Sequence, residues 1–138
     1  MSSEFDSIFV RLRAILQKNA EGFTVADSTP QRYGLEGRVG PATLQAWRGK
    51  EKTSHIPVAW VEIGKSYVSY HLMPVGSPKL SAGISAALKA RMQGKTCFNF
   101  KAADEFLFKE LEQLTAQGLA AFVKAGFVAT KDKADAGI

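Results

Sequence analysis

The chain contains little cysteine or histidine: Cys97 is its one thiol, and His55 and His71 are its two imidazoles among 138 residues. One cysteine forms no disulfide within the chain, and it excludes zinc sites that are built on cysteine pairs. A site built on two imidazoles needs a nearby carboxylate, and the candidate, Glu62, is expected at the far end of the hairpin that holds His71. The sequence therefore predicts no bound metal and no cofactor.

Long hydrophobic runs are also missing, since no apolar stretch approaches the roughly 18 residues of a membrane-spanning helix. The first six residues, Met-Ser-Ser-Glu-Phe-Asp, are polar and acidic, unlike a secretory signal. The single cysteine agrees with a reducing compartment. We therefore expect a soluble, cytoplasmic protein without membrane contact, and the sequence leaves open whether it is a monomer or a homodimer.

Complete catalytic motifs are missing as well. Gly94-Lys95-Thr96 resembles the end of a phosphate-binding loop, but Lys89 stands where that motif requires its first glycine. The sequence has no Gly-x-Ser-x-Gly elbow, and Cys97, with no base beside it, is typical of a small buried side chain. A non-catalytic protein is therefore favoured over an enzyme.

The composition is that of an ordinary folded domain. A chain of 138 residues with 46% hydrophobic content is long enough and apolar enough to form one core. We expect residues 1–130 to form a single domain, and residues 131–138, which show no periodicity, to form a disordered tail.

The charge is basic, with 18 Lys and Arg against 13 Asp and Glu and a net charge of +5. This balance favours an anionic partner, although the cations are spread along the chain as on an ordinary solvated surface. The one local enrichment consists of Lys89, Arg91, Lys95 and Lys101. It surrounds Phe98 and Phe100 and predicts, as an alternative function, a basic nucleic-acid-associated protein whose rings stack on bases. Two phenylalanines without polar tips more often face a core.

The clearest local pattern is a hairpin over residues 57–73. Two β-branched and aromatic runs meet at Gly64-Lys65, the Gly-X pair of a two-residue type II′ turn in which glycine has φ > 0. This turn would pair Ile63 with Ser66. Alternation then predicts one apolar face, which holds Ala59, Val61, Val68 and Tyr70. The other face is mixed and holds Val58, Trp60, Glu62, Tyr67, Ser69 and His71.

The mixed face is the candidate ligand site, and its predicted site residues are Trp60, Glu62, Tyr67 and His71. They combine aromatic surface with hydrogen-bonding tips, which suits a flat or amphipathic ligand or a partner protein. The leading hypothesis is therefore a non-catalytic small-ligand or protein-binding module. The alternative is that residues 32–47 or a second protomer cover this face, so that its aromatic side chains belong to a core.

Hydrophobic spacing predicts helices and strands around the hairpin. Helices are expected over residues 4–18, over residues 84–92 and from Asp104 to a glycine cap at Gly126, with Phe127 folded back. Strands are expected at residues 22–26, 32–38, 43–47 and 96–100, with an irregular corner at residues 74–78. The last strand puts Cys97 and Asn99 on one side and Phe98 and Phe100 on the other. This order lacks regular β-α alternation and predicts an α+β fold: an antiparallel sheet with a central hairpin, packed against N-terminal and C-terminal helices.

Three stretches carry a resemblance to known proteins: residues 66–75 (SYVSYHLMPV), 88–100 (LKARMQGKTCFNF) and 122–127 (FVKAGF). They resemble a group of uncharacterised small bacterial proteins that is distantly similar to the YdhG-like family, sometimes described as frataxin-like. The resemblance spans about residues 4–127. It implies a compact α+β domain with an antiparallel sheet and flanking helices, and it implies no established activity.

Iron binding, a description attached to parts of that wider family, is not carried over to this chain. Iron ions in proteins prefer clustered carboxylates. The first helix offers only Glu4 and Asp6, among Arg11, Arg13 and Lys18.

Overall fold

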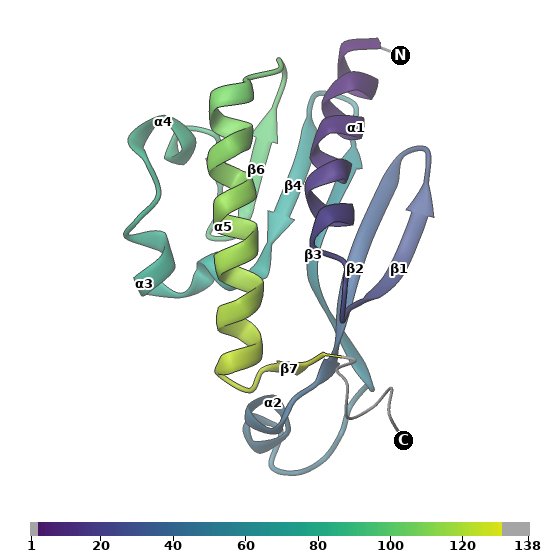
Figure 1. Ribbon diagram of the computed structural model, residues 1–138, viewed down its shortest axis with the longest axis vertical. Coiled ribbons are helices and arrows are strands. Elements are labelled where there is room, and N and C mark those ends of the chain that lie inside the picture. Colours follow the sequence, from purple (N-terminus) through teal and green to yellow (C-terminus); the bar gives the residue numbers. More distant parts are fainter. Residues whose placement is uncertain (1–2, 131–138) are drawn as a thin grey trace.

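The fold is a seven-stranded antiparallel sheet with two long helices, α1 (Ser3–Lys18) and α5 (Glu105–Lys124), on one of its faces (Figure 1). This computed structural model describes residues 3–130. The α+β class predicted from the sequence is confirmed, with helices from the two ends of the chain on the sheet. The predicted tail at residues 131–138 lies outside the described residues.

The strands follow the order β1-β2-β3-β4-β6-β5 across the sheet, and β7 pairs with one end of β2. Their bounds are β1 (Thr24–Thr29), β2 (Arg32–Val39), β3 (His55–Ile63), β4 (Val68–Leu72), β5 (Met92–Gln93), β6 (Cys97–Phe100) and β7 (Val128–Ala129). All neighbouring pairs are antiparallel, and short connections join β1 to β2, β3 to β4 and β5 to β6. The shorter helical elements are α2 (Pro41–Ala46), the 3-10 turn η1 (Met73–Gly76), α3 (Pro78–Ser81) and α4 (Ala86–Lys89).

The core lies between the sheet and the two long helices, because both helices place apolar side chains on one stripe. The buried residues of α1 are Ile8, Phe9, Leu12, Ile15 and Leu16, and those of α5 include Leu107, Phe108, Leu111, Leu114 and Leu119. From the sheet, Phe100 meets Phe108 edge to face, with ring centroids 5.0 Å apart. On their outer sides the helices are joined by Lys18, which donates to Glu112 at 2.6 Å. Figure 1 shows α1 and α5 running in front of the strands.

The ends of α5 lie where the sequence predicted them, and both are capped. The Asp104 carboxylate accepts a hydrogen bond from the Leu107 amide at 3.2 Å. At the other end Gly126 has φ +84°, its amide donates to Val123, and the Phe127 amide donates to Phe122. The rings of Phe122 and Phe127 lie 5.2 Å apart. These two bonds and the ring contact define a Schellman motif and confirm the predicted glycine cap.

The hairpin of β3 and β4 exists, but its predicted register is wrong by two residues. Ile63 pairs with Val68, Val61 with Tyr70 and Trp60 with His71. Four residues, Gly64 to Tyr67, make the connection, which the Gly64 amide closes by donating to the Tyr67 carbonyl at 2.9 Å. Gly64 does not have positive φ, so the type II′ turn is absent. A shift of two residues keeps the paired side chains of β3 and β4 on their predicted faces, because the side-chain period of a strand is two.

Val58 does not lie on its predicted face. It was expected on the mixed face and is fully buried. The pairing of β2 with β3 shifts there, with Leu35 opposite Ala59 and Glu36 opposite Pro57. Val58 is thus the extra residue of a β-bulge, which turns its side chain toward the core.

Short segments account for the other differences from the prediction. A strand was expected at residues 43–47, but residues 43–46 belong to α2, which begins with Pro41 at its first position, and Trp47 caps the end of that helix. The helix expected at 84–92 is reduced to α4, capped by the Ser85 hydroxyl, and the chain then enters β5. The corner expected to be irregular contains η1 and α3. The sequence analysis did not predict β7.

Candidate functional site

The candidate site lies on the sheet face opposite α1 and α5, which we call the open face. It carries Arg32 from β2, Trp60 and Glu62 from β3, Ser69 and His71 from β4, and Cys97 and Asn99 from β6. Alternation places these residues together, because their neighbours Val61, Tyr70 and Phe98 are fully buried in the core. Most side chains of the open face are partly exposed, 41% for Glu62 and 21% for His71, whereas Ser69 is buried. Residues 32–47, which could have covered this face, instead form β2 beside β3 and the helix α2.

The centre of the open face is a stack of two rings. Trp60 and His71 are cross-strand partners, and their ring centroids lie 4.5 Å apart with an interplanar angle of 11°. The guanidinium carbon of Arg32 lies 5.6 Å from the centre of the Trp60 ring. Gly34 faces Trp60 across β2, and a side chain there would approach the Trp60 Cβ to 3.2 Å. The ring pair is therefore held in place by three strands.

Charges line one side of this stack. Arg32 donates to Asp27 at 3.0 Å and to Glu62 at 3.1 Å. Burial lowers the pKa of Arg32, but its hydrogen bonds and attraction to the two carboxylates raise it more, so the guanidinium stays charged. Burial lowers the pKa of His71, Arg32 lowers it further, and Glu62 opposes both effects. His71 is thus neutral at neutral pH, and two carboxylates face one guanidinium.

Polar side chains form a hydrogen-bonded row on the other side of the stack. The Ser69 hydroxyl donates to Asn99 at 2.9 Å, and the Asn99 amide donates to Gln93 at 2.7 Å. Tyr67 reaches the same Gln93 oxygen at 3.4 Å. The row therefore joins β4, β5 and β6 and satisfies most of its polar atoms internally.

Cys97 lies next to His71, a pairing that the sequence analysis missed when it expected a buried thiol without a base. The Cys97 sulfur lies 3.8 Å from His71 Nε2, and it also contacts Asn99 Oδ1 at 3.3 Å. Burial raises the pKa of the Cys97 thiol above its ordinary value; hydrogen bonding with Ser69 opposes this increase, and the charge of Glu62 adds to it. Glu62 Oε1 lies 3.9 Å from the same Nε2. A catalytic triad uses one imidazole nitrogen for the nucleophile and the other for the carboxylate, and this geometry does not match it.

Two nitrogen atoms of the ring stack have no hydrogen-bond partner among residues 3–130: the indole Nε1 of Trp60 and Nδ1 of His71. In that part of the chain, the one buried side-chain nitrogen or oxygen without a partner is Nε of Arg13. The two ring nitrogens are therefore in contact with solvent. Each offers a hydrogen-bonding position on the open face.

Metal-binding geometry is not found among residues 3–130, where no three His, Cys, Asp or Glu side chains are grouped to share an ion. His55 does not approach His71. It lies on β3 opposite Arg38, and its Nδ1 contacts the hydroxyl of Ser54 at 2.9 Å.

The basic segment is divided in space. Lys95 precedes β6 and Lys101 follows it, so these two lysines lie beyond opposite ends of the strand. Phe98 and Phe100 are 0% and 1% exposed. The stacking rings that the nucleic-acid alternative needs therefore face the core, while Lys89, Arg91, Lys95 and Lys101 all remain exposed.

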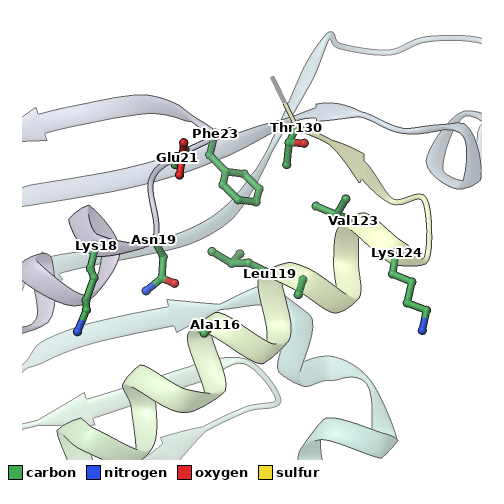
Figure 2. A pocket seen from close by; sticks show the side chains of 10 residues that line it. Lys18, Asn19, Glu21, Phe23, Ala116, Leu119, Val123, Lys124 and Thr130 are labelled. Atoms are coloured by element: carbon green, nitrogen blue, oxygen red, sulfur yellow. The ribbon is translucent and has the colours of Figure 1, made fainter. Parts of the chain in front are cut away.

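A hollow of about 490 Å³ lies between the end of α1 and the last turns of α5. Figure 2 shows the ring of Phe23 above Leu119 and Val123, with Lys18 and Lys124 at opposite ends. No predicted site residue lines it. Lys18 is already paired with Glu112. The hollow is lined by apolar side chains such as Leu119 and Val123.

Comparison of the chain with protein-family models, curated proteins and solved structures found no match. The resemblance to YdhG-like proteins therefore stays a prediction. No helix within residues 3–130 is long and apolar enough to cross a membrane.

Proposed function

We propose that this protein is a non-catalytic binding module that holds a small planar compound against the open face. The observation that carries the proposal is the fixed Trp60–His71 stack, in which one nitrogen of each ring is in contact with solvent and has no partner among residues 3–130. An indole N–H donates, and a neutral imidazole nitrogen donates or accepts. A planar compound with a complementary donor and acceptor edge satisfies both.

The charges of the open face favour a neutral or cationic compound. Asp27 and Glu62 outnumber Arg32, which both carboxylates hold in place. The site is thus locally acidic although the whole chain carries a net charge of +5. An anionic compound would be repelled by Glu62 next to His71.

Binding without chemistry is supported by the state of the two reactive groups. Cys97 is held as a thiol and His71 as a neutral imidazole, because burial disfavours the charged form of each. A nucleophilic cysteine works as a thiolate. Glu62 and Cys97 also compete for one nitrogen of His71, which leaves no carboxylate to orient the ring as a base.

The test uses tryptophan fluorescence in a Trp47→Phe background, since the chain has two tryptophans and Trp60 must be the only reporter. Neutral and cationic planar fragments are screened for changes in Trp60 emission. Hits should bind about two- to tenfold more weakly to His71→Ala, which removes one hydrogen-bonding nitrogen. His55→Ala is the matched control and should leave the affinity unchanged. Hits that bind equally well to His71→Ala would contradict the proposal.

A further inference from the structure

An apolar groove separates the last turns of α5 from η1 and α3. Its volume is about 570 Å³, within the range of small-ligand sites. The apolar walls are formed by Met73, Pro74, Leu80, Ala121, Phe122 and Phe127. Met73 is 37% and Phe127 is 42% exposed. These two are large apolar side chains left in water at the mouth of a groove, a pattern that marks a binding surface.

Close packing fixes the shape of this groove. Gly118 of α5 lies against Pro74, and a Cβ at position 118 would come within 2.9 Å of the proline side chain. The Schellman ending then holds Phe127 against Phe122 at the other end. Both walls are therefore set by the backbone of α5 and η1, and the groove exists before any ligand binds.

Three lysines without a carboxylate partner among residues 3–130 lie in or next to the groove. Lys79 lines it directly. A second hollow of about 570 Å³ adjoins it on the other side of Gly76 and Pro78, and Lys89 and Lys95 line that hollow. None of these three lysines is paired with a carboxylate within residues 3–130. Lys18, at the hollow in Figure 2, differs in this respect because it is bonded to Glu112.

We infer that the groove binds an amphipathic acid, a molecule with an unbranched hydrocarbon chain that ends in a carboxylate or a phosphate. The chain lies along Leu80 and Phe122, and the anionic group lies at Lys79, on the side of Lys89 and Lys95. Burial of the hydrocarbon supplies most of the affinity. The ammonium groups select the anion and orient the molecule.

A second copy of this chain fits the groove poorly as an occupant. In a twofold dimer the same surface meets itself, and the lysines of one copy would lie near those of the other without carboxylates between them. An amphipathic acid supplies the missing negative charge and leaves no like charges facing each other.

Chain length provides the first test, with the full chain titrated calorimetrically with hexanoate, octanoate and decanoate below their micelle concentrations. Affinity should rise about fourfold per added methylene while the groove has room, the factor expected for burying one methylene. Decanol, which lacks the charge, should bind about two- to fivefold more weakly than decanoate, and Lys79→Gln should weaken decanoate by a similar factor. Equal affinities across the acid series would overturn the inference.

The groove itself is tested with one substitution at two neighbouring positions. Ala121 and Ala120 are both exposed residues of α5, but only Ala121 lines the groove. Ala121→Glu should weaken decanoate more than tenfold, because a carboxylate then occupies the apolar wall. Ala120→Glu has the same charge and helix propensity and should bind decanoate normally. Equal losses in both variants would show that binding does not use this groove.

Two further arms separate the possible outcomes. Vesicles of phosphatidylcholine and phosphatidylglycerol test whether the anion must belong to a membrane, and binding to vesicles without binding to monomeric decanoate or decyl phosphate would overturn the inference. His71→Ala should leave decanoate binding unchanged, since the groove shares no residue with the open face. The inference about the groove and the proposed function of the open face can therefore be refuted independently of each other.

Discussion

Alternate residues of the β3–β4 hairpin lie on two faces that differ in burial and in hydrogen bonding. On the covered face Val61 and Tyr70 are 0% exposed, and the one polar group, the Tyr70 hydroxyl, meets the Thr115 hydroxyl at 2.5 Å. On the open face Trp60 and His71 stack on each other and keep two nitrogens in contact with solvent.

The difference between the faces shows which residues have freedom to act on a ligand. A buried hydroxyl without water must be paired within the protein, so Tyr70 and Thr115 use up their hydrogen bonds. A partly exposed ring exchanges water for a ligand at little cost in free energy. If this comparison is right, substitutions on the covered face change stability strongly, and those on the open face change it weakly.

The largest effect is expected from Phe108→Ala. Phe108 is 1% exposed and packs edge to face on Phe100, so its removal should lower the free energy of unfolding by about 3–5 kcal/mol. Phe106→Ala is the matched control, because Phe106 lies on the same helix and is 80% exposed. It should change stability by no more than about 0.5 kcal/mol. Denaturant titration of both variants measures the difference, and similar midpoints would refute the placement of α5.

A smaller effect is expected from Tyr70→Phe, which removes the partner of Thr115 and should cost about 1–2 kcal/mol at neutral pH. Burial raises the pKa of Tyr70, so above about pH 10 the unfolded chain releases a proton that the folded chain retains. Wild-type stability should then fall with rising pH by about 1.4 kcal/mol per unit from this group. Tyr70→Phe should lose that component and keep the part due to Tyr33, whose pKa burial also raises. An unchanged alkaline slope would contradict the buried position of Tyr70.

The faces of the hairpin could be predicted from the sequence, and its register could not. Alternation depends only on whether a residue number is odd or even, so Val61 and Tyr70 were assigned correctly. Turns of two and four residues give the same alternation. Gly64-Lys65 satisfied the local preference for the shorter turn, and neighbouring strands then set the pairing that places Trp60 opposite His71.

The sequence predicted which residues of the β3–β4 hairpin share the open face, but not which residues of other strands join them. Trp60, Glu62 and His71 lie on adjacent strands in sequence, whereas Arg32 and Cys97 reach them through β2 and β6. The alternation of residues 96–100 already separated Cys97 from the core-facing phenylalanines. What the sequence could not supply was the pairing of β6 with β4, which depends on the fold of the intervening residues.

On the open face, His71→Ala should cost only about 0.5–1.5 kcal/mol at neutral pH, the usual contribution of an aromatic pair. Burial lowers the pKa of His71. Below about pH 6.5 the imidazole therefore binds a proton more readily in the unfolded chain than in the folded chain. Wild-type stability should therefore fall as the pH drops through this range. The variant should lose that dependence, and His55→Ala should keep it. A loss of stability near that of Phe108→Ala would contradict the expectation that substitutions on the open face change stability only weakly.

The smallest effect is expected from Gly64→Ala, in the connection between the two strands. Gly64 has no positive φ, and an added Cβ would meet only the Tyr67 carbonyl oxygen, at 3.2 Å, which a shift of a few tenths of an ångström relieves. Alanine also reduces the freedom of the unfolded chain, so the net change should stay within about 0.5 kcal/mol. Gly94→Ala, in the β5–β6 turn, is the reference: Gly94 has φ +77° and open space around it, and the left-handed conformation alone should cost about 1–2 kcal/mol. Thermal and denaturant midpoints distinguish the two variants. A larger loss for Gly64→Ala would mean that the turn, rather than the pairing of neighbouring strands, keeps Trp60 opposite His71.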